Sequence, residues 1–201
     1  MLAEVAESRL VTRHGTFHAV AFRERPDGPE HMALVHGDPR KDVLVRVHSE
    51  CLTGDVFGAR RCECGAQLSS ALDAIVAEGA GVLVYLRGHE GRGIGLVAKT
   101  RTHVLQDEAG LDTVDSATAL GLPVDVRDFG AAARVLRYLG IRSVRLLSNN
   151  PDKVSALTSY GIAITGRVPL LEPVDEHNVR YLTAKRDRLG HDLPHLDAAR
   201  P

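Results

Sequence analysis

The chain has 201 residues, of which 44% are hydrophobic and 25% charged, and its formal net charge is −1 with a pI near 6.8. This composition is typical of a soluble globular protein with enough residues for a substantial core. The near-zero charge excludes overall electrostatic attraction to nucleic acid or to an anionic membrane. Aromatic residues make up 4% and include no Trp, so few side chains are available to stack on single-stranded bases. We expect no nucleic-acid partner and no membrane partner.

The first part of the chain has the pattern of antiparallel β structure. We expect strands over residues 9–12, 16–23, 31–36 and 43–47, the last of which ends at the cysteine motif. Gly15 and the Pro26-Asp27-Gly28-Pro29 segment supply two of those turns.

From residue 66 onwards, helical periodicity alternates with short apolar runs. We expect helices over residues 66–78, 96–107, 131–139, 151–160 and 175–189, strands over 81–86 and 143–147, and an extended segment over 162–170. The pattern predicts a single α+β domain with a β-rich N-terminal part and βα units packed behind it. Residues 191–201 contain two prolines, and we expect this end of the chain to be a flexible, frayed tail.

The three cysteines of the chain, Cys51, Cys62 and Cys64, lie close together in the sequence. Their clustering predicts a metal site with three thiolate ligands. Three protein ligands leave a position for water, which distinguishes catalytic zinc from structural zinc. Three cysteines cannot all pair in internal disulfides, and the start of the chain has no signal-peptide pattern. A reducing cytoplasm, where free thiolates can hold metal, is therefore the expected location.

Two other interpretations of the cysteines stay open at the level of sequence. The thiols could be small apolar residues of a core, although Arg60, Arg61 and Glu63 make the segment polar for a strand buried on both faces. A histidine, His48 or His89, could also supply a fourth ligand and close the site.

A glycine-rich segment over residues 87–96 follows a predicted strand and opens a predicted helix, with the sequence RGHEGRGIGL. Glycine N–H groups and a helix N-terminus favour a bound anion, and Arg87 and Arg92 can hold phosphate in a bidentate manner. The segment lacks the Gly-Lys-Ser/Thr of a P-loop and the glycine spacing of a dinucleotide-binding fingerprint. The alternative is a glycine-rich surface turn with solvated charges.

Two polar motifs follow. The first, DVRDF at residues 125–129, is by itself typical of a solvated surface ion pair. The second, LLSNNPDK at residues 146–153, runs from a strand into a helix with proline in its first turn, which places Ser148 and Lys153 near a helix N-terminus suited to phosphate. Ordinary helix capping by Ser or Asn is the alternative. Together with the metal site, the motifs predict a phosphorylated substrate that is hydrolysed by metal-activated water.

Four features follow one another along the chain: the cysteine trio, the Glu-Gly-Arg-Gly-Ile-Gly loop, the Asp-x-Arg-Asp-Phe motif and the Ser-Asn-Asn-Pro-x-Lys motif. In this order they resemble the GTP cyclohydrolase II family. Tyr181-Leu182, Lys185 and Gly190-His191 resemble the ending of that family, so the resemblance covers nearly the whole chain. We therefore expect a GTP cyclohydrolase II-like domain over residues 1–190 and the tail over residues 191–201.

The resemblance implies an enzyme that opens the guanine imidazole ring of GTP. Such an enzyme releases formate and pyrophosphate and leaves 2,5-diamino-6-(5-phosphoribosylamino)pyrimidin-4-one, the product of the first committed step towards riboflavin. The resemblance also implies one Zn2+ per subunit, Mg2+ with the GTP phosphates, and a homodimer.

The resemblance carries specific roles onto residues of this chain. Cys51, Cys62 and Cys64 would hold Zn2+, and water as its fourth ligand would attack C8 of guanine. The positions that match GTP-contacting residues of the family are Arg46, Val47, His48, Ser49, Glu50, Gln67, Glu90, Gly91, Arg92, Thr113, Ser148 and Lys153. Gln67 would read the guanine edge, because an amide can donate and accept hydrogen bonds at once.

The DVRDF motif would supply two catalytic groups. Asp125 matches the proton acceptor of the family, and Arg127 matches the position proposed to attack the α-phosphate and displace pyrophosphate. A guanidinium is protonated at any working pH. Stabilising charge on the phosphoryl group is therefore the role that chemistry favours for Arg127.

The chain departs from the commonest family sequence at several positions. Gly88-His89 stands where many members have a single Gln, Ser148 stands for Thr, and His103 stands where a Tyr is usual. An imidazole in place of a phenol changes both proton supply and water placement. The full reaction needs two C–N hydrolyses, and our hypothesis is that His103 alters the second of them.

Three functions remain to be distinguished. The first is the complete GTP ring-opening reaction, and the second is a paralogue that stops at the formamidopyrimidine intermediate because of His103. The third is a non-catalytic zinc-containing protein that binds a nucleotide. The presence of Asp125, Arg127, Glu90 and Arg92 argues against the third.

Overall fold

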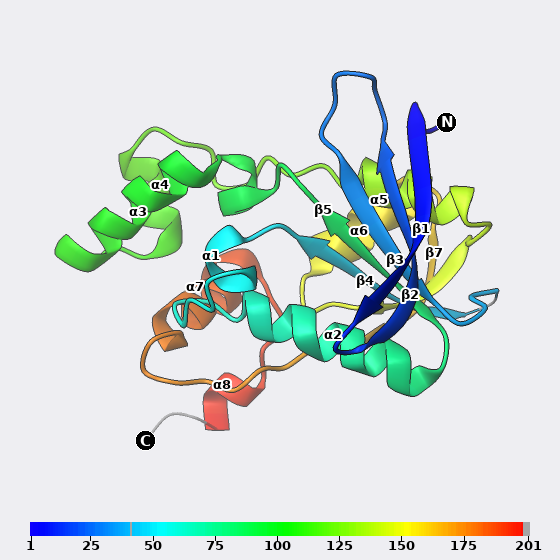
Figure 1. The fold of residues 1–201 in the computed structure, drawn as a ribbon. Helices are drawn as coiled ribbons and strands as arrows, with labels where there is room; N and C mark the ends of the chain where they lie inside the picture. The colour runs from blue at the N-terminus through cyan, green and yellow to red at the C-terminus, as the bar shows by residue number, and fades with distance from the viewer. Residues whose placement is uncertain (41, 199–201) are drawn as a thin grey trace. The chain divides into compact units, whose positions relative to one another are not determined.

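The computed structural model describes residues 1–40 and 42–198, and it combines one mixed β-sheet with helices (Figure 1). The α+β class expected from the sequence is confirmed. The chain forms two compact units. The first contains residues 1–49, 68–87 and 128–170, and the second contains residues 50–67, 88–127 and 171 onwards.

All seven strands of the sheet belong to the first unit. They are β1 (Glu4–Thr12), β2 (Gly15–Arg23), β3 (His31–His36), β4 (Val43–Ser49), β5 (Gly81–Leu86), β6 (Ser143–Leu147) and β7 (Ala163–Val168). Their order across the sheet is β1-β2-β3-β5-β4-β6-β7. The pairs from β1 to β5 are antiparallel, whereas β5, β4, β6 and β7 run parallel to one another. The predicted N-terminal strands and the predicted βα units therefore share one sheet.

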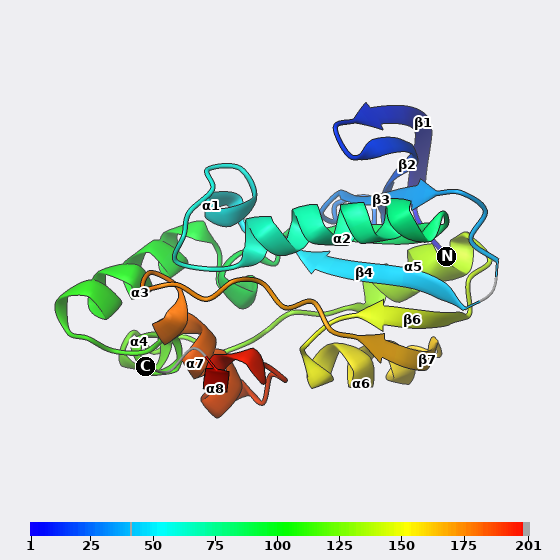
Figure 2. The same cartoon turned by 90° about the horizontal axis from the view of Figure 1, so that it is seen from below.

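Helices pack on both faces of this sheet. Residues of α5 (Gly130–Tyr138) and α6 (Pro151–Ser159) join one apolar cluster with Val20, Val45 and Val84. The part of α2 (Cys64–Glu78) that belongs to the first unit joins a second cluster with Phe17, Leu44 and Leu83. Figure 2 shows α2 on one side of β4 and β6, and α6 on the other. Successive residues Leu44 and Val45 join opposite clusters, and both are buried, as expected for a strand covered on both faces.

The parallel strands β4 and β6 end at the same edge of the sheet, since Val43 pairs with Val144 and Val45 with Leu146. Residues that follow these two strands are the usual ligand positions in such sheets. Ser49 ends β4 and Ser148 follows β6, so the topology places both predicted GTP-binding serines at this edge.

The second unit is built from helices. They are α1 (Leu52–Asp55), the 3-10 turn η1 (Glu90–Gly93), α3 (Leu96–Glu108), α4 (Thr113–Ala119), α7 (Val179–Leu189) and α8 (His195–Ala198), and α2 begins here. Leu182, Leu193 and Leu196 form a small apolar cluster. The sequence predicts a frayed tail after residue 190, yet α8 and two of these buried leucines lie within it. The division of the chain at residue 190 stays a prediction.

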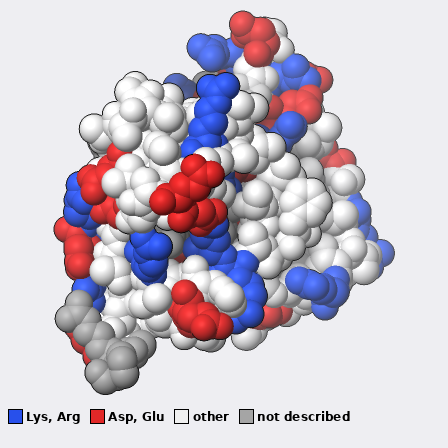
Figure 3. All heavy atoms as spheres, turned by 90° about the vertical axis from the view of Figure 1, so that its left-hand side faces the viewer, with Lys and Arg blue, Asp and Glu red and all other residues white. Residues whose placement is uncertain are grey.

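Charges of both signs are mixed on the face drawn in Figure 3, where Lys and Arg side chains alternate with Asp and Glu. This mixture agrees with the net charge of −1. Within residues 1–40 and 42–198, no helix has the length and apolar character needed to cross a membrane.

Candidate active site

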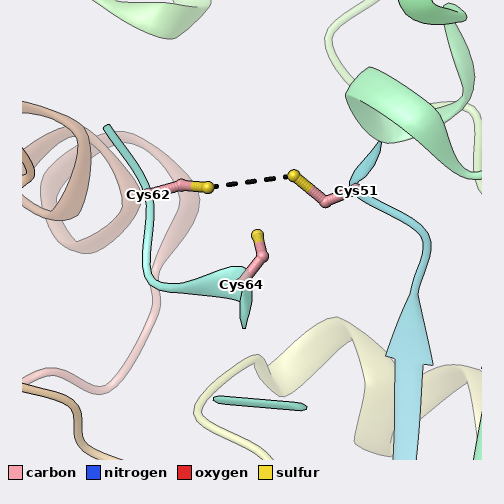
Figure 4. A group of neighbouring side chains, drawn as sticks. All are labelled: Cys51, Cys62 and Cys64. Atoms are coloured by element: carbon pink, nitrogen blue, oxygen red, sulfur yellow. Dashed lines mark hydrogen bonds between the residues drawn. The ribbon is translucent and has the colours of Figure 1, made fainter. Parts of the chain in front are cut away.

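The three cysteines meet in the second unit. Cys51 lies between β4 and α1 and immediately precedes α1. Cys62 lies in the loop before α2, and Cys64 is the first residue of α2. Their sulfur atoms lie within 4.8 Å of one another, and Figure 4 shows all three pointing towards a common centre. The predicted convergence of the three thiols is confirmed.

One of the sulfur–sulfur distances matches a tetrahedral metal. A zinc ion with Zn–S bonds of about 2.3 Å and tetrahedral angles holds its sulfur ligands about 3.8 Å apart. The Sγ atoms of Cys51 and Cys62 are 3.8 Å apart. Among the described residues of the second unit, no His, Asp or Glu joins this group, so His89 does not close the site as a fourth ligand.

Two glycines allow the cysteine segments to approach each other. A Cβ atom on Gly54 would lie 3.0 Å from Cβ of Cys64, 3.1 Å from Sγ of Cys62 and 3.2 Å from Sγ of Cys51. A Cβ atom on Gly65 would lie 2.3 Å from the carbonyl oxygen of Gly54. Any larger residue would push the loop carrying Cys51 away from the start of α2.

The thiols hydrogen-bond to each other, so they do not ionise independently. The hydrogen bond with Cys62, followed by that with Cys64, lowers the pKa of the Cys51 thiol, and the Lys99 ammonium acts in the same direction. The bond with Cys51 raises the pKa of Cys62 to about 11, and the bonds with both neighbours raise that of Cys64. A bound metal would displace the remaining thiol protons, because the metal ligand is the thiolate.

A lysine–glutamate pair adjoins the cysteines. The Lys99 ammonium, on α3, donates hydrogen bonds to Glu90 Oε1 at 2.6 Å, Thr53 Oγ1 at 2.9 Å and Cys51 Sγ at 3.2 Å. The other carboxylate oxygen of Glu90 accepts a bond from the Leu52 backbone N–H at 2.7 Å. Burial by itself lowers the pKa of Lys99, but Glu90 and the Cys51 thiolate raise it above its usual value. The lysine is therefore charged at neutral pH.

A second buried pair involves the residue between Cys62 and Cys64. The Lys185 ammonium donates to Glu63 Oε1 at 2.5 Å and lies 4.8 Å from the ring centroid of Tyr181. Burial lowers the pKa of Lys185, but the charge of Glu63 raises it overall. These contacts connect α7 to the start of α2 within the second unit.

The glycine-rich segment presents Arg92. Its backbone adopts φ 60°, a left-handed conformation that costs a non-glycine residue about 1–2 kcal/mol. Its Nη1 donates to Thr113 Oγ1 at 3.2 Å, and its guanidinium lies 5.8 Å from the ring centroid of Tyr181. Its Nη2 atom is buried, and within the described residues it has no hydrogen-bond partner. Such an atom suits an anionic ligand.

Thr113 and Tyr181, the two side chains that contact Arg92, also line a pocket of about 860 Å3 in the second unit. The pocket is bounded by residues 59–61, the end of α3, the start of α4, and α7. Its volume lies within the range typical of small-molecule sites, which is about 300–1,000 Å3.

Asp125 and Arg127 form an ion pair. The Arg127 guanidinium Nε donates to both carboxylate oxygens of Asp125, at 2.9 Å and 3.2 Å, and its backbone N–H donates to Oδ1 at 3.1 Å. Burial would raise the pKa of Asp125, but the bonds from Arg127 hold it below its usual value. The neighbouring backbone also contacts the glycine segment, because the Val126 N–H donates to the Arg92 carbonyl at 3.0 Å.

His103 lies one helical turn beyond Lys99 on α3 and is half-buried. Residues four apart share a helix face, so the imidazole lies on the same side of α3 as the lysine that reaches Cys51. Burial, and then the charges of Arg61 and Lys99, lower the pKa of His103. The imidazole is therefore neutral at pH 7.

The predicted site residues of the first unit have structural partners there. Arg46 Nη1 donates to the Leu147 carbonyl at 3.0 Å, and the Lys153 ammonium donates to the Val47 carbonyl at 2.9 Å. Ser148 Oγ accepts from the Asn150 N–H at 3.1 Å, and the ring of His48 stacks on Tyr85. All of these except Tyr85 were singled out in the sequence as part of a motif or match. Arg46 and Lys153 thus fix the ends of β6 and β4.

Sequence reasoning missed Lys99 and assigned Glu90 only to the nucleotide. The one local signal for Lys99 is its place in the first turn of the helix that follows the glycine-rich segment. Glu50, also assigned to the nucleotide, accepts a bond from the Gly88 N–H at 2.6 Å. Gln67 is buried in α2, one turn after Glu63.

Three thiols that converge within 4.8 Å, with charged groups around them, are typical of a metal-dependent enzyme. The family model described as GTP cyclohydrolase II matches residues 3–169. The chain belongs to the GTP cyclohydrolase II family.

Individual relatives agree with this assignment. The chain is 60% identical over 191 residues to a GTP cyclohydrolase-2 of Streptomyces coelicolor, a match that covers 94% of this chain and 86% of that protein. It is 55% identical over 202 residues to the riboflavin biosynthesis protein RibBA of Mycolicibacterium gilvum, covering 98% of this chain and 48% of RibBA. The chain thus spans about half the length of this RibBA.

A solved structure matches more distantly. It is RibBX, a two-domain 3,4-dihydroxy-2-butanone 4-phosphate synthase from A. baumannii, with a TM-score of 0.48 and 21% sequence identity. The match covers 82% of this chain and 40% of that one.

Proposed function

We propose that this chain is a GTP cyclohydrolase II that acts in riboflavin biosynthesis. The enzyme opens the imidazole ring of GTP, releases formate and pyrophosphate, and leaves 2,5-diamino-6-(5-phosphoribosylamino)pyrimidin-4-one. The convergence of three thiols within 4.8 Å, in a chain of this family, is the observation that carries the proposal. It favours a catalyst over a protein that only binds a nucleotide.

Cys51, Cys62 and Cys64 would hold a zinc ion as thiolates. When bound, zinc would polarise a water molecule for attack on C8 of guanine. The role of the protein is to keep three sulfurs in place and leave a fourth position open. Glu90 helps to hold Cys51 in place, because its carboxylate accepts hydrogen bonds from Lys99 and from the Leu52 N–H next to Cys51. We therefore assign Glu90 chiefly to positioning, with Gly91 and Arg92 closer to the nucleotide.

Arginines of the second unit would bind the phosphates. Arg92 has a buried Nη2 atom available for an oxyanion, and its Nη1 is steadied by Thr113. Arg127 carries a full positive charge, so it stabilises negative charge that develops when pyrophosphate leaves. Mg2+ bound to the GTP phosphates, as the family resemblance implies, would neutralise the rest of their negative charge.

Asp125 would accept a proton during hydrolysis. Its ion pair with Arg127 keeps it ionised, which makes it available as an acceptor at neutral pH but a weak base. Gln67 would read the guanine edge through its amide. The family resemblance assigns further GTP contacts to residues 46–50, Ser148 and Lys153.

His103 would take part in the second hydrolysis. Its half-buried imidazole is neutral at pH 7 and lies on the same face of α3 as Lys99. A neutral imidazole can both donate and accept a proton. Replacing His103 with Tyr restores the usual residue of the family. The ratio of formate to pyrophosphate released by H103Y, compared with that of the unaltered enzyme, measures the effect of His103 on the second hydrolysis.

A mass-resolved product assay tests the function. Zinc-loaded protein is incubated with GTP and Mg2+, and formate, pyrophosphate and pyrimidines are quantified, with Cys62→Ser as the metal-site control. Equal formate and pyrophosphate, lost in C62S, is the expected result. Pyrophosphate with a retained formyl group would show the diverted paralogue, and unchanged GTP in zinc-loaded protein would refute the enzyme.

Two further expectations complete the proposal. The family resemblance supports a homodimer, which light scattering of the purified protein measures directly. It also supports action in the cytoplasm, where reduced thiols can bind zinc.

A further inference from the structure

Lys99 occupies an unusual place beside the cysteines. Its side chain is only 13% exposed, and its ammonium has three acceptors: a carboxylate, a hydroxyl and the sulfur of Cys51. The acceptors come from η1, α1 and the residue before α1. An ammonium has three N–H groups, so it can donate one hydrogen bond to each acceptor. The lysine is held in a single position by its surroundings.

The contact with sulfur is the informative one. Three thiolates donate much electron density to a metal, and this weakens its ability to polarise water compared with a site of neutral ligands. A hydrogen bond from a charged donor to one thiolate withdraws part of that density. Glu90 balances the charge of Lys99, so the effect on the site comes from the N–H···S bond rather than from net charge.

We propose that Lys99 is a positioning residue that donates a hydrogen bond to the Cys51 thiolate in the metal-loaded enzyme. By doing so it reduces electron donation from that sulfur and strengthens the polarisation of the attacking water. The inference rests on the proposed function only in requiring that Cys51, Cys62 and Cys64 hold a metal. Glu90 and Thr53 serve to aim the ammonium.

Cobalt spectroscopy tests the proposal without any substrate. Co2+ bound to thiolates gives sulfur-to-metal charge-transfer absorption, whose energy falls when the sulfur becomes a better donor. Lys99→Met and Lys99→Gln should move this band to longer wavelength, more so for Met. Arg101→Met is the matched control, because it removes a cation from the same helix at an exposed position. An unmoved band in a variant that binds Co2+ would overturn the proposal.

Activity supplies a second readout. Zinc-loaded K99M should lose about 10- to 100-fold in kcat, as is typical when a partner of a metal ligand is removed, with little change in the KM for GTP. A higher KM with an unchanged kcat would contradict the proposal. The product assay on unaltered protein reports separately on whether the proposed function holds.

A measurement on the unaltered protein covers the case in which both variants fail to fold. Its ammonium groups are observed by 15N NMR before and after Cd2+ is bound at the cysteines. The Lys99 ammonium signal should be protected from exchange and should shift on metal binding. A Lys99 signal that does not respond to Cd2+ would refute the N–H···S bond.

Discussion

Gly54 offers a direct test of how closely the cysteine segments must approach. Replacing it with Ala adds one methyl group whose carbon would lie 3.0–3.2 Å from Cys64 Cβ and from the sulfurs of Cys62 and Cys51. The backbone of Gly54 is not in the left-handed region, so the substitution adds no backbone strain. The change therefore acts on the metal site alone, by forcing its members apart.

The size of the effect follows from the contacts. Inserting a methyl group into a well-packed site costs about 1–3 kcal/mol. If this cost falls on the metal-bound state, zinc affinity decreases by about 5- to 140-fold, since 1.4 kcal/mol corresponds to a factor of ten. Gly166→Ala is the matched control, because its nearest neighbour would lie 3.7 Å away, at ordinary contact distance.

Competition with a chromophoric chelator measures the zinc affinity of G54A, G166A and the unaltered protein. Circular dichroism of each metal-free sample confirms that the fold is retained. Weaker zinc binding in G54A alone is the expected result. Equal affinity in all three proteins would refute the argument that the sulfurs need the space left by Gly54.

Two further predictions concern stability. Arg127 holds the pKa of Asp125 below its usual value. The carboxylate therefore stabilises the fold above the unfolded pKa of about 3.9, and this contribution disappears as pH falls through the folded value. Urea unfolding should show Asp125→Asn less stable than the unaltered protein at pH 7, with a smaller difference at pH 3; an equal difference at both pH values would contradict the ion pair. Leu196, 4% exposed, packs with Leu182 and Leu193, so Leu196→Ala should cost about 2–5 kcal/mol in the same assay. Leu171→Ala, at a 40% exposed site, is its control, and equal losses would show that α8 is not packed.

Local sequence pattern predicted several elements closely. The strands His31–His36, Gly81–Leu86 and Ser143–Leu147 have the predicted bounds, because each is a short apolar run between turn residues. The helix α4 was missed, although Asp112 accepts bonds from the N–H groups of Val114 and Asp115 in the manner of an N-cap. Its sequence carries the capping residue but little apolar periodicity.

The start of the last long helix was predicted too early. Asp175 accepts bonds from the N–H groups of His177 and Asn178, and Asn178 Oδ1 accepts one from the Asp175 N–H. These bonds form a turn, so α7 begins at Val179 rather than at residue 175. Side chains of Asp and Asn compete with helical hydrogen bonds in this way. Helical periodicity alone does not detect that competition.

The sequence by itself determined the chemical content of the site. The number and spacing of the cysteines predicted a three-thiolate centre, and the order of the four motifs predicted the family, because both are properties of the chain that need no folding to be visible. Tertiary structure decided how the centre is supported. Lys99 reaches Cys51 across 48 positions of the sequence, and Glu90 reaches Leu52 across 38. Contacts of this kind depend on how helices pack, and local sequence pattern does not encode that packing.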